Sequence, residues 1–332
     1  MSFQLVKVRR EHYRDRRGLD PLEGLMEVEI EVCSKEKHGV DSYLFVGSGE
    51  EEINYQREAI EKLSQERYWN DTVLKKYSDQ IKIDKKAFQT SYDPYSKQKV
   101  NVIFGSSVKG NVKSRLQLTL QPYKGTAIAC IYPSRILKSH PPIGTSGWRH
   151  FKIWEDSLQY VRENVCNATA RPVVCLLCDL FGAPGLSSLI EFGTFYMTEG
   201  STVDLGHEVE RVAAAKPGSR FRGSVSFKAV KLEELGLLLI GMGYSIVDGR
   251  HKSMPVLLGS HKYRGLNRNL MGRVTYNVLN LKTSSRCKGD GIVTCGTVYE
   301  KGELENVLIN ALKAAFDKFG PYIKQIDECR KV

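Results

Sequence analysis

Long apolar runs, internal repeats and low-complexity tracts are all missing from this chain of 332 residues. Without a window of about 18 apolar residues, nothing in the sequence is suited to span a bilayer, so we expect no membrane partner. The first residues are charged where a secretory signal needs an apolar stretch, which predicts a cytoplasmic protein. Eight cysteines in a chain of this length, without an export signal, predict thiols or metal ligands rather than disulfides.

Acidic residues are fewer than basic residues in this chain. Lys and Arg total 49 against 38 Asp and Glu, which gives a formal net charge of +11. A basic balance of this size favours a polyanionic partner, either nucleic acid or an anionic membrane surface, over simple solubility. The basic residues concentrate in 1–20, 82–115 and 244–290. If these segments converge in space, they form the kind of groove that an RNA strand requires; otherwise they are three solvated faces.

Hydrophobic periodicity predicts six core elements. Residues 25–33 alternate between apolar residues and glutamates, which predicts a strand with one buried face. The other elements are a helix at 106–118, strands at 189–197 and 220–230, a helix at 232–242 and a strand at 273–281. This β-α-β-β-α-β order is that of the α+β ferredoxin-like fold shared by RNA recognition motifs (RRMs). We therefore predict a single RRM-like domain over 1–332.

Two large insertions interrupt the predicted core. Residues 47–92 are charged, and a capping box at Ser48 predicts a helix from there to about residue 62. Residues 120–180 are rich in Pro and Gly, contain cysteines, and include a predicted helix at Phe151–Val165. Outside the insertions, we expect a polar connector at Thr198–Val209 and a last amphipathic helix at Glu303–Lys318.

The segment Gly105–Arg115 is the candidate phosphate-binding centre. A predicted strand, Val100–Phe104, ends at Gly105, where the missing side chain lets another backbone approach closely. Ser106 or Ser107 can cap the following helix, whose first N–H groups are free to bind phosphate oxygens. The alternative is an ordinary capped helix with solvated lysines.

A nucleotide-binding P-loop is excluded at this segment. Gly105 and Gly110 have the glycine spacing of that motif, but Asn111 stands where the motif requires lysine. Lys109 and Lys113 share one helix face instead, because they are four residues apart. The segment therefore presents cations without the lysine position that a nucleoside triphosphatase needs.

Five segments, in the same order, resemble a known family. They are the turn at 93–95 with the GSSVKG helix start at 105–110, and the segments at 178–182, 217–221, 234–238 and 259–272. Together they resemble the CRISPR-associated RAMP superfamily, the RRM-fold subunits of type III RNA-guided complexes. The resemblance covers roughly Leu25 to Leu281.

The resemblance implies a subunit that binds CRISPR RNA beside other RAMP subunits and helps to form the target-RNA channel. Gripping phosphate and ribose makes physical sense, because the guide bases must stay free to pair. The candidate RNA-binding residues are Gly47, Ser48, Gly105, Ser106, Ser107, Lys109, Gly110, Lys113, Arg115, Arg250, His251, Lys252, His261, Lys262 and Arg264.

Two features depart from the family pattern. Phe104 stands where most members have proline before the first glycine. The stretch from Phe195 to Pro217 leaves room for only a short version of the family's thumb hairpin, unless the thumb is supplied elsewhere. The short thumb suggests a terminal or specialised subunit rather than the repeated one, whereas Phe104 marks either a specialised subunit or nothing at all.

The alternative function is that of a metal-dependent endoribonuclease of the same fold, which cuts target RNA or processes precursor RNA. Family members that cut RNA use an aspartate after the first strand, and this chain offers Asp71, Asp79 and Asp84 there. Such a carboxylate can bind Mg²⁺. None of the three stands in a motif, so we favour a solvated face and assign no catalytic residue.

Cysteines supply a candidate metal site. Cys166, Cys175 and Cys178 lie close together, and the last two have zinc-ligand spacing. A complete site needs a fourth ligand, and the candidates are Cys130, His140 and His150. Structural zinc and buried free thiols both fit, since cysteine also behaves as a small apolar residue.

Aromatic residues near the basic segments can serve either RNA binding or core packing. Tyr263 lies among cations and can stack on an RNA base, or it can pack at the rim of the core. Trp148 and Trp154 flank a predicted loop–helix boundary, where tryptophans usually anchor the core.

Overall fold

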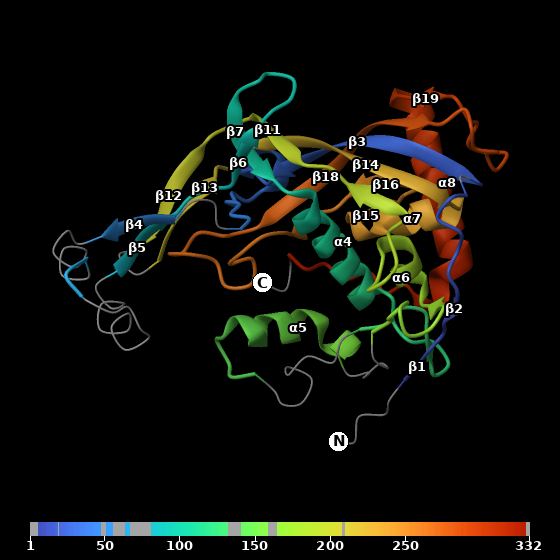
Figure 1. Ribbon diagram of the computed structural model, residues 1–332, viewed down its shortest axis with the longest axis horizontal. Helices are drawn as coiled ribbons and strands as arrows, with labels where there is room; N and C mark the ends of the chain where they lie inside the picture. Colours follow the sequence, from blue (N-terminus) through green and yellow to red (C-terminus); the bar gives the residue numbers. More distant parts are fainter. Residues whose placement is uncertain are drawn as a thin grey trace.

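The structure, a computed structural model, describes residues 6–18, 20–47, 51–55, 64–66, 81–131, 141–158, 165–207 and 210–329. A long sheet crosses the molecule, and its helices lie on one face (Figure 1). The three longest strands are β3 (Leu22–Val32), β14 (Arg220–Val230) and β18 (Arg273–Thr283). Below them in this view lie α4 (Gly105–Thr119) and α7 (Leu232–Gly241).

The strand order of the sheet is β18-β3-β14-β11, and all neighbours are antiparallel. In chain order these are the fourth, first, third and second core strands, with α4 and α7 as the two connecting helices. This is the ferredoxin-like arrangement, so the predicted α+β fold class is confirmed. The strand predicted at 189–197 is two strands, β10 (Ile190–Phe192) and β11 (Phe195–Glu199), and both pair with β14.

Strand β3 shows the predicted alternation but not the predicted single buried face. Its alternating apolar residues have no exposed surface: Met26, Val28, Ile30 and Val32. On the opposite face Glu29 and Glu31 are also buried, because Arg222 Nε donates to Glu29 at 3.0 Å and Lys37 Nζ lies 2.7 Å from Glu31. RRMs stack RNA bases on aromatic residues of the open sheet face. Here that face carries ion-paired carboxylates instead.

Glycines allow the helix layer to pack closely. Helix α8 (Lys301–Phe319) confirms the last helix predicted from the sequence and packs on α7. A Cβ at Gly236 would lie 2.0 Å from the carbonyl oxygen of Ala311, so only glycine fits at this crossing. A Cβ at Gly241 would lie 2.7 Å from Val112 Cγ1, so glycine also lets α7 pack closely against side chains of α4. These contacts fix the position of α4 beneath the sheet.

The sheet continues beyond its ferredoxin-like core. Strand β7 (Lys99–Ile103) pairs with β11, and β6 (Thr90–Tyr92) pairs with β7 at the edge. The strand predicted at Val100–Phe104 is thereby confirmed. Because β7 runs directly into α4, this edge hairpin is joined to the candidate phosphate-binding segment without a loop between them.

A second sheet, at the left of Figure 1, has the order β12-β13-β5-β4. Its strands are β4 (Glu51–Tyr55), β5 (Ile81–Lys86), β12 (Thr202–His207) and β13 (Glu210–Ala215). The helix predicted from 48 to 62 is therefore wrong at 51–55, and its remaining residues lie outside the described ones. The connector predicted at 198–209 contributes to a hairpin. Local charge did not reveal these strands because their pairing joins segments far apart in the chain.

The remaining elements are short, apart from α5. They are β1 (Lys7–Val8), β2 (Glu11–His12), α1 (Lys35–His38), β8 (Thr126–Ala127), α5 (Ser146–Leu158), β9 (Val173–Val174), α6 (Leu176–Phe181), β15 (Tyr244–Val247), β16 (Arg250–Ser253), β17 (Val256–Leu257), β19 (Val298–Tyr299) and the 3₁₀ turn η2 (Gly320–Tyr322). Helix α5 confirms the helix predicted at 151, although it begins earlier. Within the described ranges, no helix combines the length and apolar character that a bilayer crossing needs.

The cysteine prediction is wrong for one pair. Cys287 and Cys295 form a disulfide that closes a loop after β18, with their Cα atoms 5.8 Å apart. The expectation of thiols came from length and compartment, which carry no information about which loop ends meet in space. The other six cysteines are free, and five of them are buried.

Candidate RNA-binding surface and four-cysteine cluster

The start of α4 is built differently from its predicted cap. The N-cap residue is Phe104, whose carbonyl oxygen accepts the N–H of Ser107 at 2.9 Å. Neither Ser106 nor Ser107 caps the helix, because both lie inside its first turn. A Cβ at Gly105 would lie 2.0 Å from the carbonyl oxygen of Phe192. The predicted close backbone approach is therefore confirmed, and the approaching backbone is that of β10.

The two lysines of α4 lie on the side of the helix that faces α6 and the loop after it. Lys109 Nζ donates to Ser188 Oγ at 2.7 Å, and Lys113 Nζ donates to the carbonyl oxygen of Gly182 at 2.7 Å. Burial lowers the pKa of Lys109. Both lysines remain partly exposed at the edge of the helix.

Arg115 occupies the opposite face of α4 and is buried. It forms an ion pair with Glu328 from the C-terminal segment and donates to the carbonyl oxygens of Gly241 at 2.7 Å and Leu257 at 3.2 Å. These acceptors surround the guanidinium and use several of its N–H groups. Arg115 therefore joins α4 to the C-terminal segment, and we leave it out of the proposed RNA surface.

Between these two faces, α4 exposes a strip of small residues: Ser106, Gly110 and Ser114. Glycine inside a helix costs about 1 kcal/mol relative to alanine. At Gly110 no neighbour explains that cost, because an added Cβ would meet nothing within 4 Å. The open space above Gly110 admits a group from outside the chain.

A basic cleft of about 260 Å³ lies between α5 and the glycine-rich segment 259–272. Six cationic side chains line it: Arg149, Lys152, Lys262, Arg264, Arg268 and Arg273. No carboxylate lines this cleft among the residues that the structure describes. A concave surface with this composition concentrates positive potential and attracts phosphate.

The sequence identified only part of this cleft. Lys262 and Arg264 were predicted, whereas Arg149 and Lys152 of α5 were missed. Arg149 Nη1 donates to the carbonyl oxygen of Tyr263 at 3.0 Å, which holds α5 against the segment. The available signal was the WRHFK stretch at the start of α5, which holds two cations three residues apart.

Aromatic packing supports one wall of the cleft. Trp154 is buried, which confirms it as a core anchor, whereas Trp148 lines the cleft with Lys152 Nζ 5.5 Å from its ring centre. The rings of His150 and Tyr263 meet edge to face at 5.1 Å. Burial, with Lys262 nearby, lowers the pKa of His150 to about 4, so this side chain is neutral at pH 7. His150 and Tyr263 therefore pack at the rim.

Of the other predicted basic residues, those of strand β16 lie apart from the cleft, and His261 lies beside one of its arginines. Arg250, His251 and Lys252 belong to strand β16, and none of the three lines it. His251 Nδ1 lies 3.9 Å from Glu305 of α8. His261, which follows Gly259 in the glycine-rich segment, interacts with Arg264 Nη2 at 3.1 Å. The sequence grouped these residues by proximity in the chain, and the fold divides them between two surfaces.

Several candidates of the first insertion cannot be placed in the site. Gly47 has a left-handed φ of 75°, and a Cβ there would lie 2.7 Å from Gln89 Nε2. The local backbone and packing therefore explain why this residue is glycine. Ser48, Asp71 and Asp79 lie outside the described residues. Asp84 lies in β5, where the described structure does not extend to its side chain.

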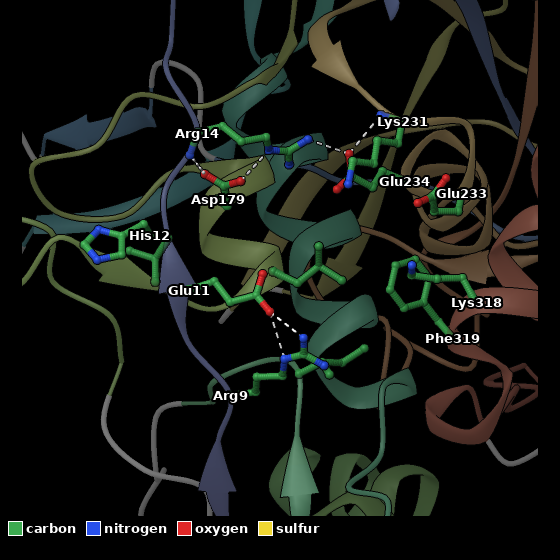
Figure 2. A pocket seen from close by; sticks show the side chains of 13 residues that line it. Arg9, Glu11, His12, Arg14, Asp179, Lys231, Glu233, Glu234, Lys318 and Phe319 are labelled. Atoms are coloured by element: carbon green, nitrogen blue, oxygen red, sulfur yellow. Dashed lines mark hydrogen bonds and ion pairs between the residues drawn. The ribbon is translucent and has the colours of Figure 1, made fainter. Parts of the chain in front are cut away.

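A cavity of about 280 Å³ at the N-terminal segment has mixed charge (Figure 2). There Arg14 points between two acids: its Nε donates to Asp179 at 2.6 Å and its Nη1 to Glu234 at 2.7 Å. Four carboxylates line the cavity beside the cations, so it does not suit a polyanion. These arginine contacts anchor the N-terminal segment to α6 and α7.

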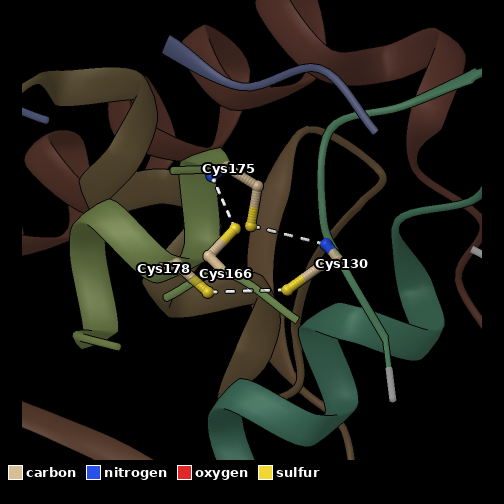
Figure 3. A group of neighbouring side chains, drawn as sticks. All are labelled: Cys130, Cys166, Cys175 and Cys178. Carbon is tan, nitrogen blue, oxygen red and sulfur yellow. Dashed lines mark hydrogen bonds between the residues drawn. The ribbon is translucent and has the colours of Figure 1, made fainter. Parts of the chain in front are cut away.

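Four cysteines meet in the core (Figure 3). They are Cys130 after β8, Cys166 before β9, and Cys175 and Cys178 at α6. Their sulfurs all lie within 4.8 Å of one another. Cys130 is thus the fourth member, while His150 lies elsewhere against Tyr263 and His140 lies outside the described residues.

Two backbone N–H groups point at sulfurs of the cluster. The backbone N–H of Cys130 donates to Cys175 Sγ at 3.4 Å, and that of Cys175 donates to Cys166 Sγ at 3.2 Å. Hydrogen bonds from the other thiols lower the pKa of Cys166, whereas hydrogen bonds within the cluster and burial raise the pKa of Cys175 and of Cys178. A tetrahedral zinc with Zn–S bonds of about 2.3 Å needs sulfurs about 3.8 Å apart. The cluster fits one such ion.

The fold and the cleft define a ferredoxin-like α+β protein with a strongly basic surface cleft. No family model matches the chain, and none of the curated proteins matches it. Among solved structures, the chain is similar to the crystal structure of Thermofilum pendens Csc2, with 12% identity and a TM-score of 0.38 over 96% of this chain and 84% of that one. It is also similar to a chain of a Type IV-B CRISPR complex, with 13% identity and a TM-score of 0.36 over 76% of this chain and 90% of that one. We base the functional assignment on this chain's own residues.

Proposed function

We propose that this protein is an RNA-binding subunit of a CRISPR ribonucleoprotein, which holds the guide RNA by its backbone in the cytoplasm beside other RAMP subunits. The observation that carries the proposal is the basic cleft, where six cations from two separate parts of the chain meet without a carboxylate. Contacts between cations and phosphates supply most of the sequence-independent affinity for a nucleic acid strand. The five segments that resemble the RAMP superfamily indicate which kind of RNA is bound.

Helix α4 supplies a second contact surface next to the cleft. Asn111 Nδ2 donates to the carbonyl oxygen of Leu257 at 2.8 Å, which places α4 beside the start of the glycine-rich segment. The exposed strip at Ser106, Gly110 and Ser114 lets a ribose–phosphate backbone approach, and its hydroxyls can donate to phosphate oxygens. An RNA held in this way keeps its bases free for a target RNA.

The test is RNA affinity as a function of salt. Purified protein is titrated into an unstructured single-stranded RNA at several salt concentrations, as wild type and as Lys152→Ala and Arg268→Ala. Both side chains are exposed in the cleft, so each substitution removes charge without disturbing the core. We expect each variant to bind more weakly and to flatten the slope of log K against log salt by about 0.7 per phosphate contact.

The matched control is Lys313→Ala, an exposed lysine of α8. It removes the same charge and should leave the affinity and the slope as in the wild type. Unchanged slopes in both cleft variants would remove the cleft from the RNA-binding surface. Cleavage of the RNA by the protein alone would instead favour the endoribonuclease alternative.

The kind of RNA is tested on protein purified from its own cells. A CRISPR subunit carries small RNAs of defined length and other subunits through purification. Sequencing of the bound RNA should return repeat-derived guides, whereas a random mixture of cellular fragments contradicts the CRISPR assignment and leaves a general RNA-binding protein.

We also propose that the cluster of Cys130, Cys166, Cys175 and Cys178 holds a structural Zn²⁺. All four positions are cysteine sulfurs and all four are buried, which is the closed arrangement of structural zinc sites. The ion would tie the loop after β8 and the segment before β9 to α6. The cluster lies in the core, so it has a folding role and no direct contact with RNA.

A further inference from the structure

The hairpin of β6 and β7 presents two tyrosines to solvent at the edge of the main sheet. Tyr95 at its tip is 92% exposed and Tyr92 is 71% exposed. These are the most exposed tyrosines among the described residues. A tyrosine has an apolar ring and a polar tip, so an exposed ring is available to pack against a ligand or a partner.

The tip is well ordered by its own hydrogen bonds. Asp93 accepts the N–H of Tyr95 and of Ser96 through its two carboxylate oxygens, each at 3.1 Å. The N–H of Lys97 donates to the carbonyl oxygen of Asp93 at 2.9 Å, and the N–H of Asp93 donates to that of Gln98 at 2.9 Å. The tip is therefore rigid before any ligand arrives, which lowers the entropic cost of binding.

The charge around the two rings favours a polyanion. Lys97 and Lys99 are both exposed, and Lys99 stands directly opposite Tyr92 in the hairpin. Between residues 90 and 103 the only carboxylate is Asp93, which is engaged by the turn. Aromatic rings interleaved with cations are the arrangement that binds single-stranded nucleic acid.

From these observations we propose that the β6–β7 hairpin tip is a base-stacking platform for single-stranded RNA, with Tyr95 as the principal ring and Tyr92 as the second. The inference rests on the proposed RNA-binding function and names a contact to bases, whereas the cleft and α4 contact the backbone. Strand β7 has five residues, so the platform stands about 17 Å from the start of α4, at 3.4 Å per residue. The RNA that reaches the tip is therefore the part that extends beyond α4.

A protein partner fits these residues less well than a base does. Two aromatic side chains bury about 150–250 Å² each, whereas a specific protein interface needs about 800 Å² from each partner. One base, in contrast, needs one ring, and stacking contributes enough to be measured for every base.

The test uses the full chain and a single-stranded RNA that carries 2-aminopurine, a fluorescent base whose emission falls when it stacks. We expect the wild type to quench the probe. Tyr95→Ala should lose the quenching and bind about tenfold more weakly, while Tyr95→Phe should keep both. Tyr92→Ala should have the smaller effect of the two alanine substitutions. Because Tyr95 is almost fully exposed, its replacement leaves folding intact.

Salt dependence separates this contact from the cleft. Tyr95→Ala removes no charge, so its slope of log K against log salt should equal that of the wild type, unlike the slope of Lys152→Ala. If Tyr95→Ala keeps the affinity and the quenching of the wild type, the hairpin tip is not a stacking platform, and the proposed RNA-binding function stands. Loss of co-purifying subunits with unchanged RNA affinity also overturns it and assigns the tip to a protein partner. Absence of RNA binding by the wild type refutes the proposed function itself.

Discussion

Gly110 and Arg115 belong to one stretch of sequence, and their surroundings in α4 are opposite. Gly110 is exposed, with open space where its side chain would be. Arg115 is buried and paired with Glu328. Glycine is costly in the interior of a helix, and no neighbour within the chain requires it at Gly110, whereas Arg115 has several internal partners and serves the fold.

Substitution of Gly110 by alanine should therefore have effects of opposite sign on stability and on binding. The free energy of unfolding should rise by about 1 kcal/mol, because alanine is the better helix residue and its Cβ meets no neighbour. RNA affinity should fall several-fold, since the methyl group occupies the space that the backbone of the RNA needs. Urea unfolding and RNA titration of the same preparation measure both.

The control for this pair of effects is Gly302→Ala in the first turn of α8, where an added Cβ also meets nothing within 4 Å. It should leave RNA affinity unchanged. If Gly110→Ala stabilises the protein and binds RNA as tightly as the wild type, the exposed strip of α4 is not part of the RNA surface.

At the scale of elements, α4 is held between α7 and the C-terminal segment by Arg115. The guanidinium connects Glu328 with the carbonyl oxygen of Gly241 in α7. Glu328 also accepts the N–H of Leu257 in β17 at 3.3 Å, so four parts of the chain meet at one ion pair. Loss of one partner leaves the other charge buried and uncompensated.

Arg115→Ala should accordingly lower the free energy of unfolding by about 3–5 kcal/mol and leave the RNA affinity of the folded fraction unchanged. The double variant Arg115→Met, Glu328→Leu should recover most of the stability, because it removes both charges and keeps apolar volume. Lys113→Ala, at the exposed edge of α4, should cost little stability. If the Arg115→Ala protein is as stable as the wild type but binds RNA more weakly, Arg115 belongs to the RNA-binding surface.

At the scale of the whole molecule, the four-cysteine cluster joins segments that have little regular structure of their own. Cys130 and Cys166 lie in loops, and the elements nearest to them, β8 and β9, have two residues each. Such short strands have few backbone hydrogen bonds of their own, so a bound ion would add to what holds these segments.

The protein purified without chelator should contain zinc in a near-equimolar amount, measured by elemental analysis. Removal of the ion should lower the melting temperature, since a ligand at a thousandfold its Kd adds about 4 kcal/mol to stability. Cys130→Ser should lose both the zinc and that stability. Cys33→Ser, a buried free cysteine outside the cluster, should keep its zinc. A zinc-free protein with an unchanged melting temperature would leave the cluster as four packed thiols.

The sequence by itself determined the core of this protein. The alternation along β3 and the helical periodicity of α8 are local, because a buried face repeats every second residue in a strand and about every 3.6 residues in a helix. The fold class followed from the order of these elements. Two of the six cleft cations and three of the four clustered cysteines were also identified, because each stands close in sequence to another member of its site.

Only the tertiary structure decided which of these residues act together. It brought Arg149 and Lys152 of α5 against a segment more than 100 residues later, and it supplied Cys130 as the fourth sulfur. It also turned Arg115 inward and replaced a predicted helix at 51–55 by a strand. In each case the position of the residue or segment depends on a partner that is distant in the chain. Local patterns of charge and hydrophobicity do not identify that partner.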